Sequence, residues 1–283
     1  MSSPLKPLNK EPDSTMPKDV IRIALNFLFA PLMWVLSSLS VFMTSARSPK
    51  ELSEINESFL VPLGIAFSIW FPIFVGCIAY GVIQTLPSKR THPLYQRIGW
   101  WTALGFGSIC VWSLASAFAP RDLAQWATAI IFVPALISLV KAMSILSQHY
   151  GSLETSERVC VFVPISLIAG WVSLAFFLNW APLATGFVHS SNTLLIMNIL
   201  ILALAMAWAL YFIRNSGANR AFAFPIAWGL AFLIIKHAFN PQGETLIAWA
   251  STIGLVSIIT ASTLKPKTYV RDFQARETTQ IED

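Results

Sequence analysis

Apolar residues occupy long, unbroken stretches of this chain, and polar residues are confined to the short intervals between them. Each stretch is about as long as the roughly 20 residues that a helix needs to cross a bilayer. Lipid cannot satisfy backbone polar groups, so such stretches span membranes as helices. Eight spans are predicted, at residues 21–44, 60–85, 98–118, 124–146, 160–180, 192–213, 221–239 and 245–264. The predicted fold class is therefore an all-α, polytopic transmembrane helix bundle.

The composition supports this prediction and adds an orientation. Only 12% of the residues are charged, against roughly 25% in an ordinary soluble domain. With eight spans, fifteen of the 19 Lys and Arg residues fall on the side of the two termini, and four on the other side. Both termini are therefore expected in the cytoplasm. Apolar helical spans favour a bacterial inner membrane, and the scattered basic residues indicate no nucleic-acid partner.

The acidic residues all lie in tails, in loops or at helix ends. Proton relays, cation sites and metal-dependent membrane enzymes normally need carboxylates inside the membrane. Cys77, Cys110 and Cys160 have no CxxC spacing and no neighbouring His, so neither a disulfide nor a zinc site is expected. No nucleophile–base pair is apparent. We therefore expect no metal, no resident cofactor and no enzymatic activity.

The outer loop "SPKELSEINESF" has a pattern of its own. Ser48 is followed by Pro49 and, three residues after Ser48, by Glu51, which is the pattern of a capping box with an N-terminal proline. Glu54 and Glu57 continue the acidic series at helical spacing. This predicts a short acidic helix at 48–58, which either bridges the first two spans or has a function of its own.

The pair Lys236-His237 is the ionisable feature near the outer end of the span 221–239. Two interpretations are open. The long lysine side chain can reach water by snorkelling, or the pair can receive an anionic group such as the carboxylate of a ligand.

Six of the 11 tryptophans lie deep inside predicted spans: Trp34, Trp70, Trp112, Trp171, Trp208 and Trp228. A buried indole N–H needs an acceptor that lipid cannot supply, so each ring is expected to face the bundle or a cavity. Pro72, Pro134 and Pro164 are expected to bend their helices, and bent helices can leave a hollow between them. Core packing and a ligand site remain alternatives for these aromatic rings.

Several of these segments resemble the TspO/MBR family, the translocator-protein-like, tryptophan-rich sensory proteins, and specifically its longer bacterial branch. The segment "VPLGIAFSIWFPIFVGCIAYGVIQ" is similar to that family's Pro-x-Gly-x-x-Phe-x-x-Trp helix, through Pro62, Gly64, Phe67, Ser68, Trp70, Phe74 and Gly81. The segment "PLYQRIGWWTALGFGSICVWSLASAF" carries the Trp-Ser step at Trp112-Ser113. The segment "VPISLIAGWVSLAFFLNWAPL" matches at Pro164, Ser166, Gly170, Trp171, Ala175, Leu178 and Asn179. "FPIAWGLAFLII" resembles the Trp-Ala helix of the longer members.

The resemblance implies a five-helix core at 21–180 around a cavity, with a lid at 45–59 between the first two spans. Residues 181–264 would then add three transmembrane helices, between disordered tails at 1–20 and 265–283. Three departures remove polar groups from the implied pocket: Ile109 replaces an Asn, while Phe74 and Ile168 replace Tyr residues.

The resemblance also implies a flat hydrophobic ligand, such as a tetrapyrrole, a sterol or an isoprenoid-like molecule. The candidate ligand-binding residues are Phe67, Ser68, Trp70, Phe74, Trp112, Trp171 and Asn179, with Ser68 and Asn179 as orienting hydrogen-bond partners. The protein would act as a sensor or regulator, or as a carrier. A secondary transporter that uses Lys236-His237 as a gate is the main alternative; an enzyme acting on the ligand and a structural partner protein are others. The expected partners are membrane lipid and the ligand, and a homodimer stays open.

Overall fold

The computed structural model of this chain describes residues 17–55, 58–240 and 243–264, and these contain helices and no strand. Eight helical segments have the length and apolar composition of membrane spans: Pro17–Ser37, Gly64–Ile83, Pro93–Phe118, Arg121–Gln148, Thr155–Thr185, Ser191–Asn215, Arg220–Ala238 and Thr245–Thr263. The prediction of an all-α bundle with eight spans is confirmed, and the protein is an integral, multi-pass membrane protein.

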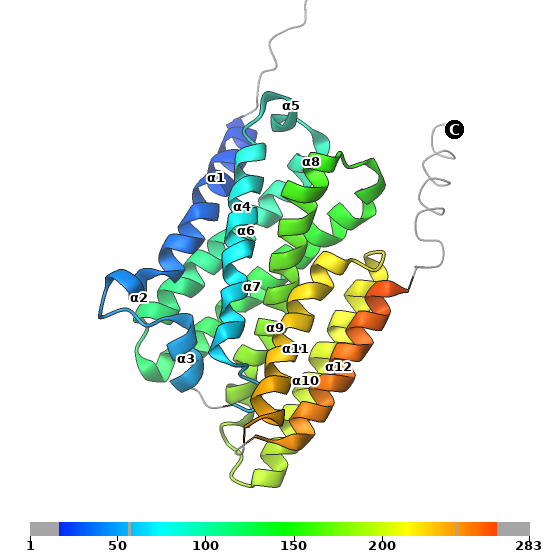
Figure 1. Cartoon of the computed structure of the whole chain (residues 1–283). Helices are drawn as coiled ribbons and strands as arrows, with labels where there is room; N and C mark the ends of the chain where they lie inside the picture. Colours follow the sequence, from blue (N-terminus) through cyan, green and yellow to red (C-terminus); the bar gives the residue numbers. More distant parts are fainter. Residues whose placement is uncertain (1–16, 56–57, 241–242, 265–283) are drawn as a thin grey trace, which may run out of the picture.

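Short elements join and interrupt these spans (Figure 1). The first half of the chain forms α1 (Pro17–Ser37), α2 (Leu39–Phe42), α3 (Pro49–Ile55), the 3₁₀-helix η1 (Gly64–Ile69), α4 (Trp70–Ile83), α5 (Pro87–Arg90), α6 (Pro93–Phe118) and α7 (Arg121–Gln148). The second half forms the 3₁₀ turn η2 (Tyr150–Ser152), α8 (Thr155–Glu157), the π-helical η3 (Arg158–Phe162), α9 (Val163–Thr185), α10 (Ser191–Asn215), α11 (Arg220–Ala238) and α12 (Thr245–Thr263).

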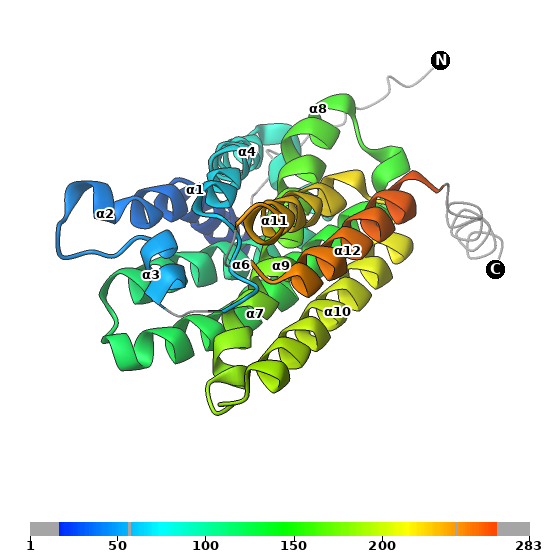
Figure 2. The ribbon, with the colours of Figure 1, turned by 60° about the horizontal axis from the view of Figure 1, so that its bottom comes forward.

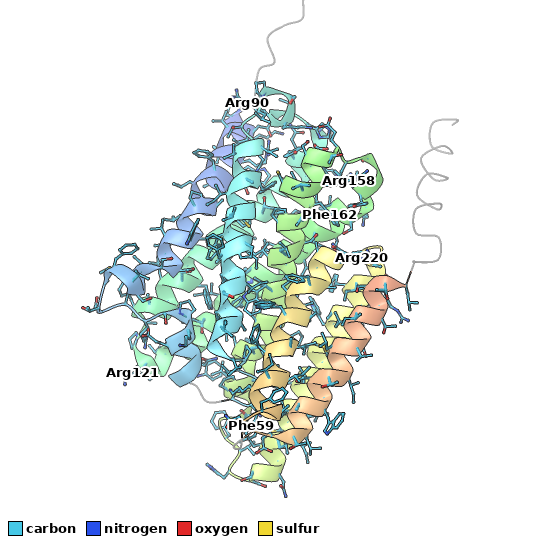
Figure 3. All side chains as sticks on the ribbon, viewed as in Figure 1. Phe59, Arg90, Arg121, Arg158, Phe162 and Arg220 are labelled. Carbon is cyan, nitrogen blue, oxygen red and sulfur yellow. The ribbon has the colours of Figure 1, made fainter. Side chains whose placement is uncertain are left out.

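The bundle has two ends, named here the α5 end and the α3 end after the short helices that lie there (Figure 1). Arg90, Arg158 and Arg220 lie toward the α5 end, whereas Arg121 and Phe59 lie at the α3 end (Figure 3). The labelled arginines thus follow the division of charge that the sequence predicts between the two ends.

Helix α9 connects the two parts of the bundle. It packs on α7 and α4 on one side and on α11 and α10 on the other, while α12 packs on α10 and α11 (Figure 2). Gly170 allows the close approach of α9 to α11, because a Cβ at this position would lie 2.1 Å from the carbonyl oxygen of Phe222. The predicted division into a five-helix core and three added helices stays a prediction, but the two parts share an extensive packed contact.

The α5 end is held by a buried arginine. The Arg22 side chain of α1 is 0% exposed and forms an ion pair with Asp19, with 3.3 Å between the two charged groups. Its guanidinium also donates to the side chain of Gln84 (3.0 Å) and to the backbone carbonyls of Tyr95 (3.1 Å) and Arg90 (2.7 Å). Arg22 therefore ties α1 to the C-terminal end of α4, to α5 and to α6.

A second polar cluster at this end involves α5 and α8. Lys89 donates to the buried Glu157 at 2.8 Å and to the exposed Glu154 at 3.4 Å, and the Tyr95 hydroxyl donates to Glu157 at 3.1 Å. The hydrogen bond to the Glu157 carboxylate raises the pKa of Lys89 above its usual value of 10.5. The fifth span is thus joined to the loop before α6.

Three span boundaries differ from the sequence prediction. Helix α1 begins at Pro17 and ends at Ser37 instead of covering 21–44, so residues 17–20 of the predicted tail are helical. The second span begins at Gly64 and is 3₁₀-helical up to Ile69. The fifth begins at Thr155 in α8 and continues through the π-helical η3, which lies before Pro164, a residue that cannot donate to the carbonyl four positions back. The rest of the predicted tails, residues 1–16 and 265–283, lies outside the described residues.

The prediction that every deep tryptophan faces inward is wrong for Trp34. Its side chain is 37% exposed and makes an edge contact with the exposed Phe71, at 5.4 Å between ring centroids. Helix α1 lies at the margin of the bundle (Figure 2), so part of its surface faces the surroundings and not a neighbouring helix.

Candidate ligand-binding site

The 3₁₀ geometry of η1 decides which side chains of the second span face the bundle. A 3₁₀-helix has three residues per turn, so side chains at i and i+3 eclipse one another. Phe67 and Trp70 therefore share one face, and Trp70 is only 8% exposed. Ser68 lies a third of a turn away and is exposed. Ser68 therefore does not line the cavity in this structure, and its role as an orienting hydrogen-bond partner stays a prediction.

The predicted tryptophans of the second, third and fifth spans meet in the bundle. The ring centroid of Trp70 lies 6.2 Å from that of Trp112 on α6 and 6.2 Å from that of Trp171 on α9. Phe67 makes an edge contact with Trp171 at 6.1 Å, and Phe74 stacks on Trp70 at 5.1 Å with an interplanar angle of 16°. Such aromatic pairs add about 0.5–1.5 kcal/mol each beyond the area that they bury.

A cavity opens beside these rings. Phe67, Trp70, Trp112 and Trp171 line it together with Phe132 of α7, while Phe74 supports Trp70 from behind and is not part of the lining. The cavity has a volume of about 40 Å³, measured as the space open to the centre of a water-sized sphere. That is room for a few water molecules at ~10–15 Å³ each. The structure therefore shows this site closed around its aromatic walls.

Helix α3 covers the cavity at the α3 end of the bundle. Pro49 and Leu52 belong to the lining, and Leu52 is only 4% exposed. The segment before α3 is fixed on α6 by Arg47, whose backbone N–H donates to the carbonyl of Ala117 at 3.2 Å and whose side chain donates to the carbonyl of Ala119. The predicted helix in this loop is confirmed over Pro49–Ile55, and its predicted role as a lid stays a prediction.

The predicted capping box of α3 is also present. The backbone N–H of Ser48 donates to the Glu51 carboxylate at 2.6 Å, and the backbone N–H of Glu51 donates to the Ser48 hydroxyl at 3.1 Å. The bond from the Ser48 backbone lowers the pKa of Glu51 below its usual value of 4.5. The predicted acidic residues Glu54 and Glu57 have side chains outside the described part of the chain.

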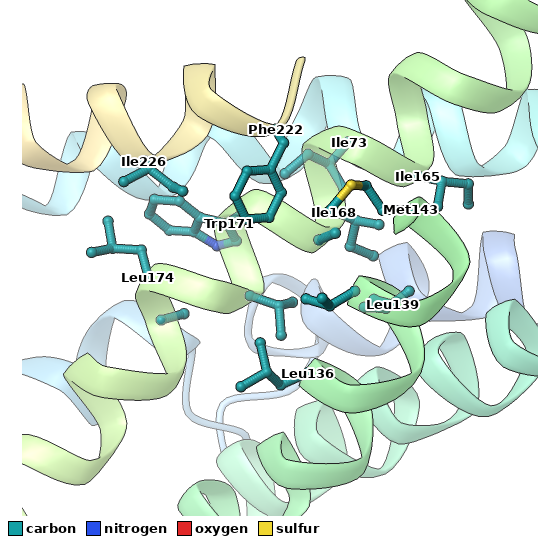
Figure 4. Packing of buried hydrophobic residues seen from close by; sticks show 14 of the residues in the cluster. Ile73, Leu136, Leu139, Met143, Ile165, Ile168, Trp171, Leu174, Phe222 and Ile226 are labelled. Atoms are coloured by element: carbon teal, nitrogen blue, oxygen red, sulfur yellow. The ribbon is translucent and has the colours of Figure 1, made fainter. Parts of the chain in front are cut away.

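Two donors in the cavity wall have no acceptor. Trp112 is 5% exposed and Trp171 is 1% exposed, and neither indole N–H has a hydrogen-bond partner within the described residues. Trp171 is held by apolar neighbours, with Phe222 and Ile226 of α11 beside its ring (Figure 4). A buried, unpaired donor costs about 1–3 kcal/mol, so two in one cavity wall require an explanation. Trp180, whose indole N–H is also buried and unpaired, does not line this cavity.

The amide side chains in the lining are those of Gln125 and Asn179. The Asn179 amide donates to the carbonyl of Ala175 on its own helix at 2.9 Å. The Gln125 amide donates to the Asn179 backbone carbonyl, which joins α7 to α9. Asn179 is therefore where the sequence prediction places it, and its side-chain carbonyl is the acceptor that it can offer to a ligand.

Sequence reasoning missed the contribution of α7. Gln125 carries a weak signal, as a polar residue one turn inside an apolar segment, but nothing in the pattern separates Phe132 from the other apolar residues of its span. Val61, just before η1, and Pro182, inside α9, also line the cavity. These residues come together through the tertiary packing of helices that periodicity alone does not place.

A comparison with protein families agrees with these observations. The family described as TSPO-like protein matches residues 22–264, which include all the walls of the cavity and the last three helices. No curated protein and no solved structure matches the chain.

Proposed function

Because the chain belongs to the TSPO-like protein family, we propose that it binds a flat hydrophobic molecule in the aromatic cavity. The proposed ligand class comprises tetrapyrroles, sterols and isoprenoid-like molecules that carry hydrogen-bond acceptors. The protein acts as a sensor or regulator, or as a carrier, and not as an enzyme. Its proposed location is a bacterial inner membrane with both termini in the cytoplasm, an orientation supported by the basic residues toward the α5 end.

One observation carries the proposal: the unpaired indole N–H groups of Trp112 and Trp171 in the wall of a single cavity. Apolar walls with a few placed polar groups are typical of small-molecule sites. A ligand oxygen or nitrogen would accept from these donors, and its ring system would lie against Trp70. The proposal thus accounts for two donors that a packed core would leave without partners.

The closed cavity means that the ligand must separate the aromatic rings as it enters. Sites for drug-sized ligands hold ~300–1,000 Å³, so a cavity of about 40 Å³ has to expand several-fold. We propose that the expansion occurs on the α3 side, where Pro49 and Leu52 are the residues of α3 that line the cavity within the described part of the chain. Binding would then include a conformational step that slows association.

The test is a titration of the purified protein with protoporphyrin IX, haem and a sterol, followed by tryptophan fluorescence with inner-filter correction. Trp112→Phe and Trp171→Phe retain an aromatic ring and remove the N–H. Each is expected to weaken binding about tenfold, the equivalent of one buried hydrogen bond. Trp70→Leu removes the stacking surface and should weaken binding further.

The control is Trp126→Phe, because Trp126 is 45% exposed and lies outside the cavity. Saturable binding that weakens in the three cavity variants and not in the control supports the proposal. Quenching that rises linearly and equally in all the proteins would show only partition into detergent, and the ligand site would have to be abandoned. Flux of a bound ligand in proteoliposomes then separates a carrier from a sensor.

The alternative of a secondary transporter relied on Lys236 and His237 as a gate or an anion contact. Neither residue lines the cavity, and both side chains donate to backbone carbonyls at the α3 end. We therefore place the transporter second.

A further inference from the structure

The segment between α3 and η1 forms part of the cavity wall without being helical itself. Residues 58–63 have no regular secondary structure, yet Val61 in this segment lines the cavity. Phe67, which follows in η1, lines it too. Carbonyl groups in such a segment have no helical partner, so they need donors from elsewhere in the fold.

Helix α11 supplies such donors from two side chains, and a third side chain donates to Ala66 in η1. The Trp228 indole donates to the carbonyl of Ala66 at 2.9 Å, and the Lys236 ammonium donates to the carbonyl of Val61 at 2.7 Å. His237 bonds through Nε2 to the carbonyl of Phe59 at 2.7 Å. As the residue number increases along α11, the number of its partner decreases. Helix α11 therefore runs antiparallel to the segment and holds it at three points over about two turns of helix.

The other two C-terminal helices support this arrangement. The backbone N–H of Glu244, just before α12, donates to Nδ1 of His237 at 3.0 Å. Because an amide N–H can only donate, Nδ1 accepts, and Nε2 carries the hydrogen that bonds to Phe59. Asn198 of α10 accepts from the hydroxyl of Ser58 at 3.0 Å. All three helices thus contribute to the position of residues 58–66.

We propose that Trp228, Lys236 and His237 are positioning residues that fix one wall of the ligand site, and that this is the role of the three C-terminal helices. The inference rests on the proposed function, because it assigns the helices to the same cavity. Lys236 and His237 then serve neither to reach water nor to receive an anionic group, because both side chains bind the protein backbone. None of the three side chains touches the ligand; they act through Val61 and Phe67.

With this assignment, the two segments that cover the cavity are held with unequal firmness. The side formed by residues 58–66 is fixed by α10, α11 and α12, and the opposite side is α3, attached to α6 through Arg47. The Lys50 side chain crosses from α3 to Gly64, where a Cβ would lie 2.5 Å from Lys50 Cε. Ligand entry then displaces α3 against a fixed wall, and release of that wall would weaken binding.

The experiment compares Lys236→Met with Lys236→Arg, and His237→Leu with His237→Gln, in the full-length protein. Arg and Gln keep a donor near the native position, whereas Met and Leu remove it. Hydrogen exchange of the backbone amides at 58–66 reports on the wall, and protoporphyrin IX affinity reports on the site. Met and Leu are expected to speed exchange in this segment and to weaken affinity about three- to tenfold, the range for one lost hydrogen bond. Arg and Gln should restore both.

Lys141→Met is the control, because it removes an exposed lysine from α7 and should leave both measurements unchanged. Unchanged exchange at 58–66 in the Met and Leu variants would overturn the proposal, and so would faster exchange with full affinity. If exchange rises throughout a Met or Leu variant, that variant is misfolded. The proposal is then judged on whether the Arg and Gln variants keep the exchange rate at 58–66 and the affinity of the wild type. If the wild type binds no porphyrin or sterol, the proposed function fails, while exchange still shows whether α11 holds the segment.

Discussion

The polar cluster at the α5 end and the cavity at the α3 end bury polar groups in opposite ways. At the α5 end, the Arg22 guanidinium meets a carboxylate, an amide oxygen and two backbone carbonyls. At the α3 end, two tryptophans that line a small cavity, Trp112 and Trp171, have buried indole N–H groups with no partner within the described residues. Among the described residues of the α5 end, the amide nitrogen of Gln84 and Nε of Arg158 are buried without a hydrogen-bond partner, but the buried Arg22 and Asp19 charges are paired with each other.

The difference indicates how the bundle divides stability and function. Paired polar groups in a low dielectric fix one arrangement of the helices that carry them, because each loss leaves another group unpaired. Unpaired donors in a cavity lower the stability of the protein without ligand, and a ligand that accepts from them removes this free-energy cost. We therefore expect substitutions at the α5 end to change stability, and those at the α3 end to change ligand binding more than stability.

The largest effect is expected from Arg22→Met. The variant leaves Asp19 buried without its cation and removes donors from the carbonyls of Tyr95 and Arg90. Removing one partner of a buried pair costs about 3–5 kcal/mol. The melting temperature in detergent should fall sharply, whereas Arg97→Met, which removes an exposed arginine from α6 at the same end, should change it little. Equal melting temperatures for the two variants would show that the Arg22 contacts do not hold this end.

A smaller effect at the same end is expected from Lys89→Met, which leaves the buried Glu157 carboxylate with the Tyr95 hydroxyl and a backbone N–H. Hydrogen bonds to charged groups contribute about 1.5–3 kcal/mol, so we expect a loss in that range. Glu154→Gln is the matched control, because Glu154 is exposed and its longer contact to Lys89 should contribute little.

The pH dependence of the Lys89 effect follows from its raised pKa. The folded pKa lies above the unfolded value of 10.5, so the stabilisation is fully present below pH 10.5 and is lost as the pH rises through the folded value. The difference in melting temperature between wild type and Lys89→Met should therefore stay constant from neutral pH to about 10 and shrink above that pH. A difference that already disappears near neutral pH would contradict the ion pair.

Much of this architecture could be predicted from the sequence because the bilayer imposes a simple rule. Apolar length predicts all eight spans, and the Ser48–Glu51 spacing predicts the capped helix α3. The position of Trp70, Trp112 and Trp171 around one site follows from the family resemblance and from the need of an indole to avoid lipid.

What could not be predicted depends on geometry that residue patterns do not carry. Arg22 reads as one more basic residue near a membrane surface, and only the packing of α1 on α6 shows that it is buried. Ser68 is a candidate through the family resemblance, and the residue pattern does not show that its side chain is exposed and outside the cavity lining. Lys236 and His237 are ambiguous in sequence, because their acceptors belong to a segment about 175 residues away.

The smallest effect is expected at α3, where solvent competes with the capping bonds. Ser48→Ala removes the acceptor of the Glu51 N–H, a type of change that costs about 0.5–2 kcal/mol of local helix stability. Glu51→Ala removes the other half of the capping box. Both should speed hydrogen exchange in α3 and the release of ligand, with little change in melting temperature. Ser190→Ala, which removes the cap of α10, should leave α3 unaffected.

The Glu51 effect should also depend on pH, with the opposite sign to that of Lys89. The folded pKa of Glu51 lies below 4.5, so its contribution is present above pH 4.5 and is lost as the pH falls through the folded value. Protection of the α3 amides, corrected for intrinsic exchange, should therefore converge in wild type and Glu51→Ala as the pH falls below 4.5. A difference that does not shrink as the pH falls would mean that the carboxylate does not cap α3. The lid would then be held by Arg47 and by the packing of Leu52 alone.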